Sequence, residues 1–421
     1  MIILGFNPSH HSSLCILQNG EIKYFIEDER ISRIKYGITP IAPFLDLLKE
    51  YQVNIITWGT PSSVYPLNPT SIPEDEYSKV DYSIWFNLLK PFVVKGRKIY
   101  ACDYSNNHHL LHSAHSFYNS GFKKAVSVVV DGLGSIYENS SHTKIRETES
   151  IFECSYPDKF KIIHQNLINE GKDLNLSRAY EMITCYLGWT NNEAGKTMGL
   201  SSYGKFNSDF PQFFNLNLFN SDLWSFRNKL AYNEYGKLIY DEKSYKEWFE
   251  GEFDDVNWIW DYGNLKRTEG QTERFNNYML GILDTEKHPE LKLKTHPKKW
   301  HYDESKITDL EKDLAWRIQN DTQQIIGDHI EKAIKKTGLK QVCCAGGYFL
   351  NCVANYYFIK RFPNVEFYFE PISNDAGTAI GAAKLIHHTE TKDTTIRPFK
   401  SLYLGKQYSK EELLEGIKKY I

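Results

Sequence analysis

Residues 125–135 read Ala-Val-Ser-Val-Val-Val-Asp-Gly-Leu-Gly-Ser, an apolar run that ends in an aspartate and two glycines. Such a run, rich in β-branched residues and closed by a glycine turn, is typical of a buried strand. The chain opens in the same way, because residues 1–7 are apolar, a polar stretch follows, and residues 14–17 are apolar again. Asn19-Gly20 then marks a hairpin turn, after which residues 21–27 return as a third strand. The two similar stretches predict two related lobes with a ligand between them.

Further strands alternate with helices along the chain. Apolar residues recur at helical spacing in the long segment 306–337, which Gly338 closes. The remaining patterns predict strands at 54–58, 341–345 and 366–369, helices at 41–50, 107–118 and from 378, and a loop at 61–90. This alternation indicates the α/β class.

Charge, cysteine usage and the length of the apolar runs argue against several classes of protein. The chain has 421 residues and a formal charge of −3, which argues against a surface that tracks nucleic acid phosphates. Its seven cysteines form no C-x-x-C pair, so a zinc knuckle is not indicated and a reducing cytoplasm is expected. The N-terminus lacks the features of a signal peptide, and no apolar run reaches the roughly 18 residues that cross a bilayer.

The stretch 108–115, His-His-Leu-Leu-His-Ser-Ala-His, suggests a metal site. His108 and His112 are four residues apart, so both rings project from one face of a helix and suit one divalent ion. Because fourteen histidines can produce such a pair by chance, spacing alone leaves a packing role open. His109 and His115 point elsewhere and are expected to pack or to form hydrogen bonds.

Two aspartates follow predicted strands. Asp131 stands at the end of the strand 125–130, where a carboxylate can bind a metal or simply satisfy a turn. Asp375, within Ser373-Asn374-Asp375-Ala376-Gly377, can cap the next helix or serve as a metal ligand. The small residues after it allow close helix packing.

Two glycine-containing motifs suit phosphate or nucleotide. Gly195-Lys196-Thr197 lacks the upstream glycine of a P-loop, so Lys196 is either a phosphate contact or an exposed lysine. Gly346-Gly347 joins a strand to a helix start, and Asn351 and Asn355 share one helical face that can contact ribose or base.

These motifs, taken in order, resemble a known family, the O-carbamoyltransferases of nodulation-factor and antibiotic biosynthesis. The resemblance spans residues 4–383, and the family is similar to the hydrogenase-maturation and tRNA threonylcarbamoyl transferases. It is carried by GFNPSHHSS, EDERISRIKYG, HHLLHSAHSFYNSGF, VVVDGLGS, EAGKTMGLSSYG, CAGGYFLNCVAN and PISNDAGTAIGAA. The resemblance implies a two-lobed actin-like ATPase fold with an insertion, and a metal and a nucleotide between the lobes.

The resemblance also assigns roles to residues. It implies that a divalent metal, Fe(II) in this family, is held by His108, His112, Asp131 and Asp375. It implies that ATP or carbamoyl-adenylate is lined by Lys196, Gly199, Gly346, Gly347, Asn351 and Asn355. It places His10 and Lys35 at the reacting carbamoyl group or its acceptor. The sequence departs from the family at His11, where an acid is usual.

The implied domain plan has five parts. Residues 1–120 form the first lobe, 121–204 begin the second, and 306–395 complete it. Residues 205–305 show little clean periodicity and are either an insertion that shapes the acceptor site or a variable surface subdomain. Residues 396–421 are a linker and the beginning of a C-terminal YrdC-like domain, which joins carbamoyl phosphate and ATP into carbamoyl-adenylate. We therefore expect a partner chain, or a longer form of this one, to supply that domain.

The expected activity is transfer of a carbamoyl group to a hydroxyl of a small acceptor such as a sugar, a nucleoside or an antibiotic. One alternative is a non-catalytic nucleotide-binding scaffold subunit that a partner completes. Another is a sugar-kinase-like phosphotransferase, to which a histidine pair is foreign because that chemistry uses Mg²⁺ on oxygen ligands.

Overall fold

The computed structural model describes residues 1–9, 11–34, 51–59, 100–103, 107–132, 134–138, 144–169, 176–187, 189, 191–208, 210, 231–232, 238–239, 307–405 and 408–418. The predicted helix at 41–50, the predicted loop at 61–90 and most of the predicted insertion at 205–305 lie outside these residues. His10 and Lys35 lie outside them as well.

The first sheet has five strands in the order β3-β2-β1-β4-β5. They are β1 (Ile2–Asn7), β2 (Ser13–Gln18), β3 (Glu21–Glu27), β4 (Ile55–Trp58) and β5 (Tyr100–Asp103). β1, β2 and β3 form an antiparallel meander, whereas β4 and β5 run parallel to β1. The β2–β3 turn is formed by Asn19 and Gly20, both at positive φ, which confirms the predicted hairpin.

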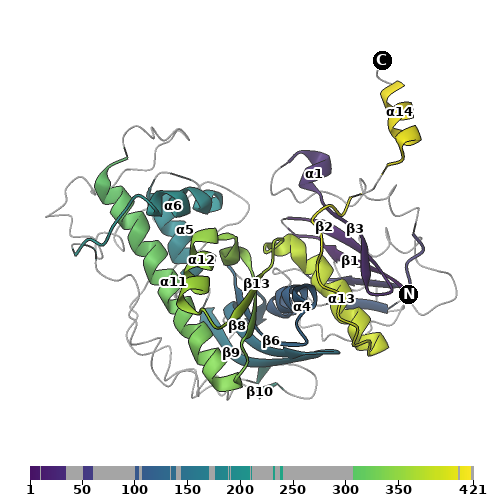
Figure 1. Ribbon diagram of the computed structural model, residues 1–421, viewed down its shortest axis with the longest axis horizontal. Coiled ribbons are helices and arrows are strands. Elements are labelled where there is room, and N and C mark those ends of the chain that lie inside the picture. The colour runs from purple at the N-terminus through teal and green to yellow at the C-terminus, as the bar shows by residue number, and fades with distance from the viewer. Residues whose placement is uncertain are drawn as a thin grey trace.

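The second sheet repeats this plan. Its strands are β6 (Lys124–Val130), β7 (Ile136–Glu138), β8 (Lys144–Ser155), β9 (Lys159–Asn169), β12 (Gln341–Ala345) and β13 (Glu366–Phe369). β6 is antiparallel to β8, and β8 to β9, whereas β12 and β13 continue parallel to β6. β7 pairs with β8 beyond the end of β6. Both sheets therefore have an antiparallel meander of three strands followed by two parallel strands, which confirms the predicted pair of related lobes and the two-lobed actin-like α/β fold (Figure 1).

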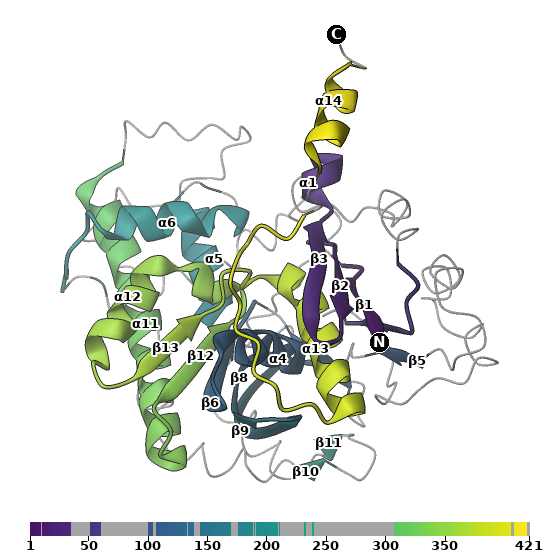
Figure 2. The ribbon, with the colours of Figure 1, turned by 45° about the vertical axis from the view of Figure 1, so that its right-hand side comes forward.

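Two helices form the layer between the sheets (Figure 2). α4 (His108–Ser120) follows β5 of the first sheet but packs against β6, β8 and β12 of the second. α13 (Thr378–Thr391) follows β13 of the second sheet but packs against β1, β2 and β4 of the first. The two helices also pack against each other. Each helix thus packs on the sheet of the other lobe, so the chain passes from the first lobe to the second at α4 and returns to the first at α13.

Glycines permit this close packing. A Cβ atom on Gly5 would lie 2.0 Å from the carbonyl oxygen of Ala379, and one on Gly381 would lie 2.1 Å from that of Leu111. Both distances are far shorter than a van der Waals contact, so no larger residue fits without movement of the backbone. The predicted close packing of the small residues after Asp375 is confirmed.

A buried polar chain also joins the two central helices. Lys384 on α13 donates to Asn119 on α4 (Nζ···Oδ1 2.6 Å), and Asn119 donates to Glu370 after β13 (Nδ2···Oε2 2.9 Å). Glu370 also accepts from Tyr368 Oη at 3.1 Å and lies 3.4 Å from His115 Nε2. Burial raises the pKa of Glu370 to about 7 and lowers that of Lys384 to about 8, so each group can change its protonation state near neutral pH.

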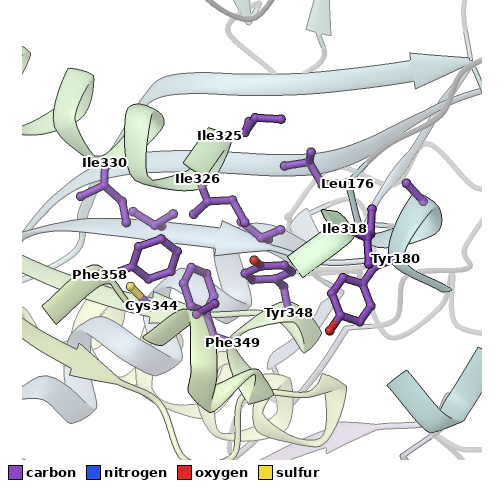
Figure 3. Close-up of a cluster of buried hydrophobic side chains, with 14 of the residues drawn as sticks. Leu176, Tyr180, Ile318, Ile325, Ile326, Ile330, Cys344, Tyr348, Phe349 and Phe358 are labelled. Carbon is purple, nitrogen blue, oxygen red and sulfur yellow. The ribbon is translucent and has the colours of Figure 1, made fainter. Parts of the chain in front are cut away.

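Further helices lie on the outer side of the second sheet, where α11 packs against β6 and the other three pack against α11. They are α5 (Leu176–Tyr186), α6 (Ala194–Ser201), α11 (Asp309–Thr337) and α12 (Cys352–Arg361). In Figure 3 the isoleucines of α11 face Tyr348, Phe349 and Phe358, which form the core of this lobe. A capping box between Thr308 and Glu311 begins α11, which ends before a left-handed Gly338 as its sequence predicts.

The remaining described elements are short. They are α1 (Glu29–Ser32), α14 (Lys410–Lys418), the pair β10 (Ala231–Tyr232) and β11 (Leu238–Ile239), and the 3-10 turns η5 (Asn191–Glu193), η8 (Gly347–Leu350) and η9 (Asp375–Gly377). Within the described parts of the chain, no helix combines the length and apolar character that a membrane span requires.

Candidate metal centre

The histidine pair lies on the first two turns of α4. His108 and His112 are fully buried, and their Nε2 atoms are 3.1 Å apart. The backbone N–H of His108 has no partner within the helix and instead donates to Ser135 Oγ at 2.9 Å. Both rings therefore face one point at the start of the helix, as the four-residue spacing predicts.

Two aspartates reach the same point from the second sheet. Asp131 ends β6, and its Oδ2 is 3.4 Å from His108 Nε2. Asp375 lies in η9 after β13, with Oδ1 3.5 Å from His108 Nε2 and 3.4 Å from His112 Nε2. The carboxyl ends of parallel strands meet at one edge of a sheet, so these two carboxylates converge although 244 residues separate them in the chain (375 − 131).

The arrangement fits a single divalent cation. The four candidate ligand atoms all lie within 4.8 Å of one another and belong to buried residues. Two ligands about 2.1 Å from one ion and at roughly a right angle to each other are about 3 Å apart, close to the 3.1–3.5 Å measured here. Two imidazoles and two carboxylates form a mixed donor set that suits Fe(II), Zn or Mn.

The charges at this point also favour a cation. Burial lowers the pKa of His108, but Asp375 and Asp131 outweigh it and raise that pKa to about 10. Burial and Asp375 act to raise the pKa of Asp131, but the hydrogen bond from His108 and the charge of His112 lower it to about 2. The two carboxylates thus stabilise a positive charge between them. In the absence of a metal, the proton on His108 carries that charge.

A second group, formed by the buried His387 and His388 and the partly exposed Asp393, has similar donor types. Its carboxylate is already engaged, because Arg397 Nη2 lies 2.7 Å from Asp393 Oδ2 and Thr395 donates to Oδ1. This group is better explained as an anchor for the segment that follows α13.

The glycine pair after β12 lies directly beside the metal-ligand candidates. The backbone N–H of Gly347 donates to Asp131 Oδ1 at 3.1 Å. Gly346 has φ +96°, and a Cβ atom there would lie 2.3 Å from the carbonyl oxygen of Val130. Only glycine fits this close approach of β12 to the end of β6, so the motif fixes one side of Asp131.

The other candidate nucleotide residues are placed differently. Asn351 caps α12 by accepting from Ala354 N at 3.0 Å, and it donates to Gln319 Oε1 at 2.8 Å. Asn355 donates to the carbonyl oxygen of Phe349 at 2.8 Å, while its own Oδ1 is buried without a hydrogen-bond partner among the described residues. The two side chains therefore shape the helix start, and their predicted contact with a nucleotide stays a prediction.

The glycine–lysine motif lies on α6. Lys196 is half-exposed and pairs with Glu193 at 2.8 Å, and Gly199 is exposed, with open space around its Cβ position. Their predicted role at a phosphate, like the roles of His10 and Lys35, remains untested.

Comparison with known families identifies the chain. The family model described as "Carbamoyltransferase N-terminus" matches residues 71–255 and 270–384. The chain belongs to this family. This confirms the family resemblance that the motifs predict.

Curated relatives of this carbamoyltransferase-family chain are much longer. An uncharacterized protein of Synechocystis, sll1178, is 25% identical over 319 residues, which are 73% of this chain and 41% of that protein. An uncharacterized protein of Methanocaldococcus jannaschii, MJ1058, is 25% identical over 341 residues, which are 79% and 46% of the two chains. The chain thus spans less than half the length of these relatives.

Among solved structures, full-length HypF in its phosphate- and nucleotide-bound form aligns with a TM-score of 0.41 and 13% identity. The alignment covers 93% of this chain and 56% of HypF.

Asn7 and Ser13 are two residues beside the site that the sequence motifs of this family member do not single out. Both are fully buried, Asn7 at the start of the β1–β2 turn and Ser13 at its end, and their side chains donate to the carbonyl oxygens of Asp375 and Ala376. A polar residue beside a turn is ordinary turn chemistry, so the sequence carries no signal for either residue. The partner of Asn7, 368 residues away, emerges only from the fold.

Proposed function

We propose that the chain is the transferase half of an O-carbamoyltransferase. It transfers a carbamoyl group from carbamoyl-adenylate, made from carbamoyl phosphate and ATP, to a hydroxyl of a small acceptor such as a sugar, a nucleoside or an antibiotic. The observation that carries the proposal is the convergence of His108, His112, Asp131 and Asp375 in a chain of the carbamoyltransferase family. The relatives are more than twice as long as the aligned part, and the proposal assigns the making of the adenylate to a further domain or a partner.

In this proposal the four residues would hold one divalent ion, Fe(II) or another, which would supply positive charge for the adenylate phosphate. The acceptor oxygen attacks the carbamoyl carbon, the bond from that carbon to the phosphate oxygen breaks, and AMP leaves with the bonding electrons. His10 takes the proton of the acceptor hydroxyl, and Lys35 faces the carbamoyl group. Gly346 and Gly347 let the backbone approach the nucleotide, while Lys196, Gly199, Asn351 and Asn355 complete its binding.

Metal content of protein purified without oxygen is the first test. The wild type is expected to hold about one divalent transition metal per chain, and the His108→Ala/His112→Ala double variant to hold none. His388→Ala is the matched control, because it also truncates a buried histidine. His388 lies near the end of α13, ten residues (388 − 378) beyond the helix start that adjoins Asp375. Retention of metal by the double variant would refute the assigned site.

Activity is tested with preformed carbamoyl-adenylate, a set of hydroxyl acceptors and the loaded protein. Carbamoylated product from the wild type and from His388→Ala, but not from the double variant, is the expected result. A metal-loaded wild type that binds nucleotide and transfers to no hydroxyl, even with the partner domain of a longer relative added, would favour the scaffold role instead.

A further inference from the structure

Asn7 occupies a special place at the end of β1. It is fully buried, and its side-chain amide makes four hydrogen bonds with described residues. Its Oδ1 accepts from the backbone N and the Oγ of Ser9 at 3.0 and 2.7 Å. Its Nδ2 donates to the carbonyl oxygens of His11 at 3.3 Å and Asp375 at 3.0 Å. Both donors and both acceptor positions of the amide are therefore in use.

These four bonds join two parts of the molecule. Ser9 and His11 belong to the turn between β1 and β2 in the first lobe, whereas Asp375 follows β13 of the second. Ser13 reinforces the link, because its buried Oγ donates to the carbonyl oxygen of Ala376 at 2.7 Å. Two consecutive carbonyl groups of the Asp375 loop are thus held by side chains of the first lobe.

The turn needs such support. His11 has φ +57°, a left-handed conformation that residues other than glycine adopt infrequently. Asn7 holds both sides of this residue's turn, accepting from Ser9 before it and donating to the carbonyl group of His11 itself. The same amide therefore fixes the shape of the turn and its distance from the Asp375 loop.

We propose that Asn7, assisted by Ser13, is a positioning residue that locks the β1–β2 turn of the first lobe to the loop that carries the metal-ligand candidate Asp375. The inference rests on the proposed function for the identity of the site. An asparagine is required because one side-chain group must donate and accept at the same time. An aspartate of the same shape cannot donate and would set a carboxylate against two carbonyl oxygens.

The sequence offers a matched pair of substitutions. Asn7→Asp removes the donor at the site end of β1. Asn54→Asp makes the same chemical change at the opposite end, where Asn54 Oδ1 only accepts, from Ile2 N at 2.8 Å, so an aspartate keeps that bond. Ser13→Ala is a second, milder variant that removes only the bond to Ala376, and it decides the matter if Asn7→Asp does not fold.

Hydrogen–deuterium exchange of the metal-free full chain tests the lock itself. Peptides that cover residues 371–380 are expected to exchange at least several-fold faster in Asn7→Asp, and faster to a smaller extent in Ser13→Ala, with no change in Asn54→Asp. Unchanged exchange of these peptides in both site variants would overturn the proposal, whether or not the protein binds metal.

Cobalt titration then tests the consequence for the site, since a purely structural role would leave the ligand field unchanged. In the wild type, Co(II) is expected to give visible d–d bands, and Asn7→Asp is expected to alter them and to weaken Co(II) binding about tenfold or more. Asn54→Asp should match the wild type. A wild-type chain without d–d bands refutes the metal site of the proposed function but leaves the exchange result to decide the lock. Wild-type spectra in both site variants would overturn the positioning role.

Discussion

Replacement of Gly381 by alanine sets two physical effects against each other. Gly381 lies within α13, where alanine is favoured over glycine by about 1 kcal/mol because it restricts the unfolded chain. A Cβ atom at this position, however, would lie 2.1 Å from the carbonyl oxygen of Leu111 on α4. Since carbon and oxygen normally approach to about 3.3 Å, α13 and α4 must separate by more than an ångström.

The packing effect should prevail. Overpacking of a well-packed interface costs about 1–3 kcal/mol, and the upper end applies here because the obstacle is backbone rather than a flexible side chain. With about 1 kcal/mol subtracted for helix propensity, Gly381→Ala should lose about 2 kcal/mol of unfolding free energy. Leu111 lies between His108 and His112, so the displacement should also weaken metal binding.

Urea unfolding followed by circular dichroism measures the effect, with a lower midpoint and an unchanged slope as the expected result. Gly195→Ala is the control, because Gly195 is also helical but has nothing within 4 Å of its Cβ position. That variant should equal the wild type or gain up to about 1 kcal/mol. If Gly381→Ala is as stable as Gly195→Ala, the reasoning about the close approach of the helices is wrong.

Three further predictions follow from the same geometry. Gly346→Ala places a Cβ atom 2.3 Å from the carbonyl oxygen of Val130, in a residue whose φ is +96°. It should lower the free energy of unfolding in urea by about 1–3 kcal/mol, and a wild-type midpoint would contradict this. Metal affinity should rise with pH by up to about tenfold per unit below pH 10, because the metal must displace the proton that His108, with its pKa of about 10, holds in the metal-free protein. Calorimetry in buffers of different ionisation enthalpy should show proton release on binding, and an affinity independent of pH would exclude this displacement. Burial raises the pKa of Glu370 from 4.5 to about 7, so its contribution to stability is fully present below pH 4.5. That contribution declines by at most about 1.4 kcal/mol per pH unit as pH rises from there through 7. Glu370→Gln should not show this decline, and a variant with the wild-type pH profile of unfolding would contradict the prediction.

Local sequence patterns predicted the elements of the fold well. The apolar run 125–130, the Asn19-Gly20 turn and the helical spacing in 306–337 each produced the expected element. These features succeed because strand period, turn chemistry and helix caps depend on neighbouring residues. The exchange of α4 and α13 between the lobes could not be predicted in this way, because it depends on contacts between residues hundreds of positions apart.

The candidate site shows the same division. The four-residue spacing of His108 and His112 predicted a shared helical face, whereas the grouping of Asp131 and Asp375 with them was implied by the family resemblance. Asn7 gives no such signal, because an asparagine after a strand is ordinary turn chemistry until its partner is known. Long-range hydrogen bonds from a single amide are set by tertiary structure alone.

The origin of the four ligand candidates constrains how this protein can work. Asp131 and Asp375 follow strands of the second sheet, and α4, which carries both histidines, packs on that same sheet. A metal held by these residues therefore belongs mechanically to one lobe. The first lobe meets it through the β1–β2 turn and the bonds from Asn7 and Ser13. A movement between the lobes would leave His108, His112 and Asp131 in place but would strain or break these bonds, so the position of Asp375, unlike that of the other three, would depend on the first lobe.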